Sequence, residues 1–196
     1  MNTNQKGKFL LVAVALVAMA AMVGFAVRAD DDDDLTRFST RLTGFQEVAP
    51  QLVNATGTFR GTLSEDGTRI SWTLTYTGLT GGAQAAHIHF APRGVTGGIV
   101  VFFCNNAAGG TVNNGAAAPK CPDDGTTAHS GTVTGFWTAA DVQALASQNV
   151  AAGNFAGLLR FLRAGLGYAN VHTMAHPGGE IRGQVRVHER ERGEEN

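Results

Sequence analysis

Hydrophobic and polar residues alternate with a period of two along several short stretches of the chain. The alternation is clearest over residues 37–42, 56–63 and 70–77. Successive side chains of a β-strand point to opposite faces, so each stretch predicts a strand with one buried and one solvent-facing side. The Asp66-Gly67 pair lies between the second and third stretches and predicts a hairpin turn there.

The pattern continues through the second half of the chain. Residues 84–90 and 130–137 predict two further short strands, and residues 181–188 predict a final strand, because apolar or small residues alternate there with polar ones. Residues 99–103 form a continuous apolar run, which predicts a strand that is covered on both faces.

Two stretches before the final strand have helical character. Thr138 and Asp141 resemble an N-terminal cap, and Val142 and Leu145 begin an apolar stripe behind it. Residues 154–163 predict a second short helix. The sequence therefore predicts an all-β fold, an antiparallel, Greek-key-like β-sandwich of about eight strands with one or two short helices inserted before the last strands.

The first 29 residues have the pattern of a secretory signal peptide. Lys6 and Lys8 precede the apolar run 9–26, and residues 27–29 place small side chains at the two positions that a signal peptidase inspects. We expect cleavage after residue 29. An uncleaved membrane anchor is the alternative, since about 17–18 apolar residues could just span a bilayer.

Export would change the charge of the chain. The net charge is −1, and removal of residues 1–29 takes away three basic residues, leaving 12 basic and 16 acidic residues and a charge of −4. This balance does not indicate a basic nucleic-acid-binding protein. Residues 30–35 are expected to be a solvated acidic leader rather than a calcium site. Residues 36–188 form the predicted domain, and residues 189–196 a charged, flexible tail.

The two cysteines, Cys104 and Cys121, are predicted to form a disulfide, because an exported chain folds in an oxidising compartment. A thiolate metal site is the weaker alternative, since no histidine stands close to either cysteine in the sequence. Secretion to the periplasm, the cell envelope or the medium is the expected localisation, without membrane association after cleavage of the signal peptide.

Four of the six histidines are candidate metal ligands. His87 and His89 share one face of the strand predicted over residues 84–90, with Ile88 turned to the core. His172 and His176 lie at a strand end that enters a Pro-Gly turn. If the two segments are neighbours, three or four imidazoles meet and suit copper or zinc.

The alternative for these histidines is structural, because a His-x-His pair on a strand can simply bond to neighbouring backbone. His129 and His188 are expected to be solvated. Four carboxylates fall in predicted turns or caps, where they have structural roles: Glu47, Glu65, Asp66 and Asp141. Glu180 and Arg182 are predicted to form an ion pair. No residue is assigned a catalytic role.

Four segments of the sequence resemble the CHRD (chordin-repeat) family. They are residues 41–48 (RLTGFQEV), 86–89 (AHIH), 171–173 (VHT) and 177–184 (PGGEIRGQ). The resemblance implies a bacterial-type secreted single-domain member of this family, which is named for the repeats of chordin, an extracellular protein that binds growth factors. His87, His89 and His172 lie within the family segments, whereas His176 stands where the family often has another residue.

The leading hypothesis is a non-enzymatic, extracytoplasmic binding or structural module, with a protein or envelope component as its partner and a copper or zinc ion at the histidines. The alternative is a copper-dependent redox protein similar to superoxide dismutase, because the His-Ile-His segment is similar to the paired-histidine strand of those enzymes. The bridging histidine, zinc-side aspartate and positioned arginine that a dismutase requires are not identifiable in the sequence.

Overall fold

The computed structural model describes residues 36–188, so the predicted signal peptide, acidic leader and tail lie outside the described residues. The strands are β1 (Arg37–Thr43), β2 (Thr56–Leu63), β3 (Ile70–Thr77), β4 (Ala83–Phe90), β5 (Gly98–Asn105), β6 (Thr111–Val112), β7 (Ala116–Ala117), β8 (Gly131–Trp137), β9 (Gly167–Thr173), β10 (Ile181–Gln184) and β11 (Arg186–His188). The helical elements are η1 (Gly44–Gln46), η2 (Ala139–Asp141), η3 (Ala146–Gln148) and α1 (Phe155–Arg163).

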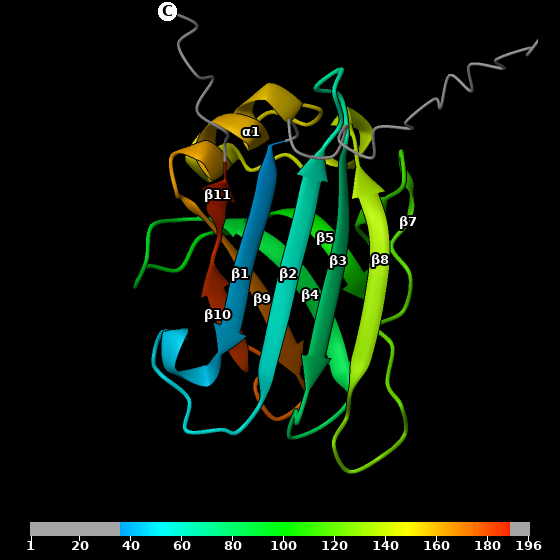
Figure 1. Cartoon of the computed structure of the whole chain (residues 1–196), viewed down its shortest axis with the longest axis vertical. Helices are drawn as coiled ribbons and strands as arrows, with labels where there is room; N and C mark the ends of the chain where they lie inside the picture. Colours follow the sequence, from blue (N-terminus) through cyan, green and yellow to red (C-terminus); the bar gives the residue numbers. More distant parts are fainter. Residues whose placement is uncertain (1–35, 189–196) are drawn as a thin grey trace, which may run out of the picture. The chain divides into compact units, whose positions relative to one another are not determined.

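Apart from β6 and β7, which form a separate two-stranded sheet, nine of the described strands form one antiparallel sheet that folds over on itself. Its order is β5-β4-β9-β10-β1-β2-β3-β8, and β11 also pairs with β1. Figure 1 shows β1, β2, β3 and β8 in one layer and β4, β5 and β9 in the layer behind it. The two edge strands approach each other, because the Trp137 indole N–H donates to the Phe102 carbonyl at 2.6 Å. The predicted all-β sandwich is confirmed, and it is nearly closed into a barrel.

The final predicted strand, residues 181–188, is divided in two. β10 pairs with both β9 and β1, whereas β11 pairs with β1. Val185 lies between them, and its N–H donates to the Gly167 carbonyl at 2.9 Å, which extends the pairing with β9 by one residue before the chain turns to β1. The chain thereby passes from one layer to the other at this corner of the sandwich.

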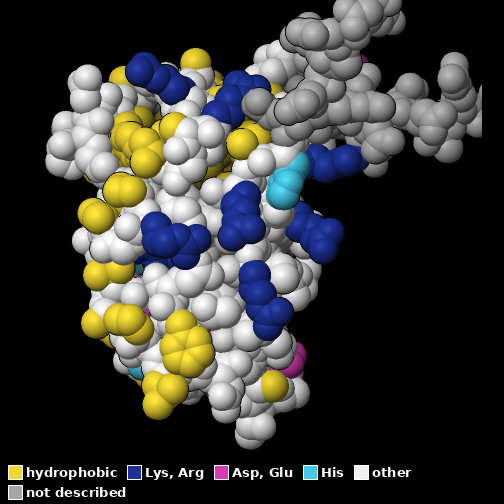
Figure 2. Space-filling model, turned by 60° about the vertical axis from the view of Figure 1, so that its left-hand side comes forward, with side chains coloured by type: hydrophobic (Ala, Val, Ile, Leu, Met, Phe, Trp, Pro, Cys, Tyr) yellow, Lys and Arg dark blue, Asp and Glu magenta, His cyan; other side chains and the backbone are white. Residues whose placement is uncertain are grey.

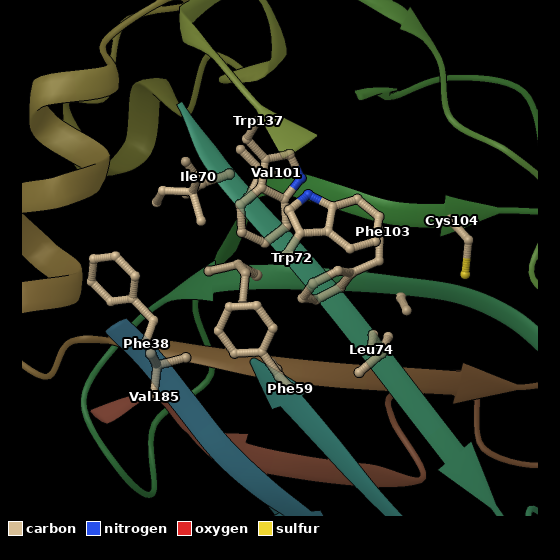
Figure 3. Close-up of a cluster of buried hydrophobic side chains, with 14 of the residues drawn as sticks. Phe38, Phe59, Ile70, Trp72, Leu74, Val101, Phe103, Cys104, Trp137 and Val185 are labelled. Atoms are coloured by element: carbon tan, nitrogen blue, oxygen red, sulfur yellow. The ribbon is translucent and has the colours of Figure 1, made fainter. Parts of the chain in front are cut away.

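The alternating residues of the predicted strands fill the space between the layers. Phe59, Trp72, Phe103 and Trp137 meet there, with ring centroids 5.0 Å apart for Trp72–Phe103 and 5.3 Å apart for Phe59–Phe103. Figure 3 shows these rings directed toward one another from β2, β3, β5 and β8. Burial of each such side chain stabilises the fold by about 1.5–3 kcal/mol, so this cluster fixes the two layers relative to each other.

Of the two predicted helices, only the second forms as an α-helix. Asn154 caps α1 by accepting a hydrogen bond from the Gly157 N–H at 2.8 Å. The cap predicted at Thr138 and Asp141 is confirmed, because the two residues form a capping box, but the helix predicted behind it is only the single 3-10 turn η2, which ends at Asp141. The backbone N–H of Gln143 then donates to the Val100 carbonyl at 2.9 Å, so sheet-like bonding replaces the next helical turn.

The disulfide prediction is confirmed. Cys104 on β5 and Cys121 are bonded, with Cα atoms 4.9 Å apart, and they close a segment of sequence separation 17. Within residues 36–188, no helix has the length and apolar character needed to cross a bilayer.

Candidate metal centre

Three of the four candidate histidines meet on the outer face of β4 and β9. These strands are antiparallel neighbours, with Ala85 opposite His172 and His87 opposite Asn170. Ile88 is fully buried in the core, so His87 and His89 point away from it, as predicted. The register between the two strands therefore brings His172 beside the His-x-His pair.

The three side chains present converging nitrogen atoms. One ring nitrogen from each of His87, His89 and His172 lies within 4.8 Å of the other two. The buried nitrogens without a hydrogen-bond partner are Nδ1 of His87, Nε2 of His89 and Nε2 of His172. A buried polar atom without a partner costs about 1–3 kcal/mol, so three of them in one place indicate a site that a ligand completes.

Backbone carbonyls orient two of the rings. His89 Nδ1 lies 3.0 Å from the Gly97 carbonyl oxygen, and His172 Nδ1 lies 3.0 Å from the Pro177 carbonyl oxygen. A carbonyl only accepts, so each Nδ1 carries the proton and each Nε2 keeps its lone pair. Metal-ligating histidines are held in this way by their second nitrogen.

Burial keeps the three imidazoles neutral. Desolvation, with a smaller effect of the neighbouring histidines, lowers the pKa of His87 to about 2. Desolvation lowers the pKa of His89 to about 4, against the opposing effect of its bond to Gly97, and it also lowers the pKa of His172. At neutral pH a metal ion therefore does not have to displace protons from these imidazole nitrogens.

Aromatic and cationic groups pack around the histidines. Tyr168 stacks on His89 with ring centroids 4.7 Å apart and an interplanar angle of 4°. The Cζ atom of Arg182 lies over the Tyr168 ring, 3.4 Å from its centroid. Phe102 meets His87 edge-on at 4.6 Å. These contacts fix the ring positions.

The buried carboxylate of Glu47 accepts a hydrogen bond from Asn170, the residue of β9 that stands opposite His87. The Asn170 side chain donates to Glu47 Oε1 at 2.5 Å and to the Ile181 carbonyl at 3.1 Å. Desolvation raises the pKa of Glu47 to about 7, despite the opposing effects of Asn170 and Arg182. Glu47 does end η1 in a turn, as predicted, but its burial and its contact with Asn170 are not visible in the sequence, where a turn carboxylate is normally solvated.

The predicted ion pair between Glu180 and Arg182 does not form. Glu180 accepts hydrogen bonds from the Thr80 N–H at 2.7 Å, the Thr80 hydroxyl at 2.9 Å and the Thr173 hydroxyl at 2.7 Å. Arg182 donates to the Pro92 carbonyl at 3.1 Å and covers Tyr168. Glu180 and Arg182 therefore bond to polar groups on different segments of the chain and not to each other.

The other histidines lie apart from this cluster. His176 is outside the group of converging nitrogens, and its backbone carbonyl closes the turn by accepting from the Gly179 N–H at 3.0 Å. His129 Nδ1 lies 3.1 Å from an Asp123 carboxylate oxygen, so this histidine has an acidic partner. His188 is exposed at the end of β11, with Nε2 2.9 Å from the Ser39 hydroxyl.

The donor set fits a borderline transition-metal ion. Three neutral imidazoles suit zinc or copper, and three protein ligands leave a coordination position open. Zn–N bonds of about 2.0–2.1 Å place two tetrahedral ligands about 3.4 Å apart. The nitrogens, which lie within 4.8 Å of one another, would therefore draw together by up to about 1.4 Å on binding an ion.

Fold and site together define a disulfide-bonded β-sandwich domain with a histidine cluster on the outer face of one layer. The family model of the CHRD domain matches residues 38–185, and the chain belongs to this family. Comparison with curated proteins and with solved structures gave no match.

Proposed function

We propose that this CHRD domain is an exported binding module that holds one copper or zinc ion through His87, His89 and His172. The observation that supports the proposal is the convergence of three buried, unpartnered imidazole nitrogens. Export accords with the disulfide, because such bonds persist in oxidising compartments. The signal-peptide pattern at the N-terminus of the sequence also supports export.

The ion would stabilise the domain as well as supply a binding function. Its ligands come from two strands that are far apart in the sequence, so an ion that binds only the folded chain raises the free energy of unfolding. A bound ion would keep an open position, to which a partner's donor atom could bind.

Metal analysis of the purified protein tests the proposal. We expect one Cu²⁺ or Zn²⁺ per chain to remain after desalting, and we expect His87→Gln and His172→Gln to lose it. His188→Gln and His176→Gln serve as matched controls and retain the ion, because those side chains lie outside the cluster. Equal retention by all four variants, or no tight ion in the parent protein, would contradict the proposal.

A copper-dependent redox reaction, such as superoxide dismutation, is the second candidate. The specific observation in its favour is the set of three histidine ligands, which would leave the fourth position of a tetrahedral ion to a small exogenous ligand. We expect this candidate to show as turnover of superoxide by the copper-loaded protein that is lost in His172→Gln. If the fully copper-loaded protein showed no turnover of superoxide, the redox candidate would be refuted and only the binding-module proposal would remain.

A further inference from the structure

The described part of the chain carries an excess of positive charge, although the whole chain does not. Residues 36–188 contain ten Lys and Arg residues against seven Asp and Glu residues. Three of those seven carboxylates, Glu47, Asp141 and Glu180, are buried, as is one of the ten basic residues, Arg182, which leaves nine basic residues against four acidic ones. The accessible charge of the domain is therefore strongly basic.

A groove on the face formed by β11, β1 and β2 collects this charge. It has a volume of about 450 Å³, and its lining includes Arg41, Arg60, Arg93, Arg186 and His188. None of the lining residues is Asp or Glu. Figure 2 shows basic side chains gathered across the middle of this face, with a histidine among them.

The sheet register sets the spacing of the arginines. Ser39 on β1 stands opposite Arg60 of β2 on one side and Arg186 of β11 on the other. Neighbouring strands lie about 4.8 Å apart, so the two arginine Cα atoms are about 10 Å apart, and Arg41 follows about 7 Å along β1. The three arginines therefore form a triangular cluster of positive charge across the three strands.

The arginines are available to such a ligand. Arg41, Arg60, Arg93 and Arg186 are exposed. Arg93 donates to the Gln46 side chain at 3.0 Å, and no ion pair with an acidic side chain of residues 36–188 engages the other three. Arginine binds sulfate and carboxylate groups through two parallel hydrogen bonds, which gives geometry as well as charge.

The neutral polar lining of the groove suits a hydroxyl-bearing ligand. The Gln184 side chain lines the groove and uses its N–H groups on the Ala91 carbonyl at 3.0 Å and the Gly165 carbonyl at 2.8 Å. Its Oε1 is buried and has no hydrogen-bond partner. The hydroxyls of Ser39, Thr40 and Thr58 also line the groove, and they can exchange hydrogen bonds with sugar hydroxyls.

We propose that this groove binds an acidic polysaccharide, a chain of sugar units that carry sulfate or carboxylate groups. The guanidinium groups of Arg41, Arg60 and Arg186 bind the charged substituents, and the hydroxyls of Ser39, Thr40 and Thr58 bind the sugar. This surface is separate from the histidine cluster, so its function does not depend on the metal ion.

Binding to polysaccharides of matched length tests the proposal with the chain recovered after export. Heparin supplies sulfate groups, polygalacturonate supplies carboxylates, and dextran is the neutral control. We expect both acidic polymers to bind at about 0.15 M salt and to dissociate toward 1 M salt, because the Debye length falls from about 8 Å to about 3 Å. Arg60→Gln with Arg186→Gln should weaken binding at least tenfold.

The control variant carries the same charge change elsewhere. Arg69→Gln with Arg160→Gln removes two exposed arginines outside the groove and should change affinity less than twofold. Circular dichroism verifies that both variants are folded. Equal loss in the two variants, no binding of either acidic polymer, or equally tight binding of a DNA oligonucleotide or polyphosphate would overturn the proposal.

Discussion

The buried histidines make acid stability a sensitive test of the site in the metal-free protein. The pKa of His87 is about 2 and that of His89 about 4 in the folded chain, whereas both titrate near 6.5 when unfolded. At pH 5 the unfolded chain binds two protons that the folded chain excludes. The free energy of unfolding therefore falls as the pH drops below 6.5, down to about pH 4 for His89 and about pH 2 for His87.

The size of the stability change depends on how far the pH lies below the pKa of each histidine in the unfolded chain. From pH 7.5 to pH 5, each of the two histidines lowers the free energy of unfolding by about 2 kcal/mol, about 4 kcal/mol together. Glu47 acts in the opposite direction, because its raised pKa of about 7 makes the folded state bind a proton. Its contribution is present at pH 5 and decreases by about 2 kcal/mol as the pH rises to 7.5.

A comparison of variants separates the two effects. Urea unfolding with chelator present, at pH 7.5 and pH 5, gives the loss of stability for the parent and for His87→Gln with His89→Gln. We expect the loss to be smaller by about 4 kcal/mol in that double variant. His129→Gln with His188→Gln should behave as the parent does. The same pH dependence in all three proteins would refute burial of neutral imidazoles.

Further predictions concern the scaffold. Cys104→Ser with Cys121→Ser should lower the free energy of unfolding by about 3 kcal/mol, since the bridge closes a loop of sequence separation 17. Gly179→Ala should cost about 1–3 kcal/mol, because φ is +126° and a Cβ would lie 2.7 Å from Glu47 Oε1. Phe103→Ala should cost about 3–5 kcal/mol in the core. Urea unfolding measures all three, and Phe45→Ala, at 68% exposure, is the control expected to change little.

The strands could be predicted from the sequence because their evidence is local. Two-residue alternation in β2 and β3 reports directly which residues face the core. The helix predicted after Thr138 failed because a contact distant in sequence, between Gln143 and Val100, redirects the backbone. Local propensity carries no information about such a contact.

The site was only half visible in the sequence for the same reason. The shared face of His87 and His89 follows from strand geometry alone. Their meeting with His172 depends on the pairing of β4 with β9, which long-range packing decides. Burial of Glu47 against Asn170 likewise depends on the position of η1 over β9, so this carboxylate could not be distinguished from a solvated turn residue.

The location of a bound ion is the most direct test of the central claim. Crystals of the protein grown with one equivalent of Cu²⁺ or Zn²⁺ per chain would show the ion by anomalous scattering at its absorption edge. We predict a single peak about 2.0–2.1 Å from Nδ1 of His87 and Nε2 of His89 and His172. A peak elsewhere on the molecule, with these three nitrogens bonded to water alone, would contradict the account.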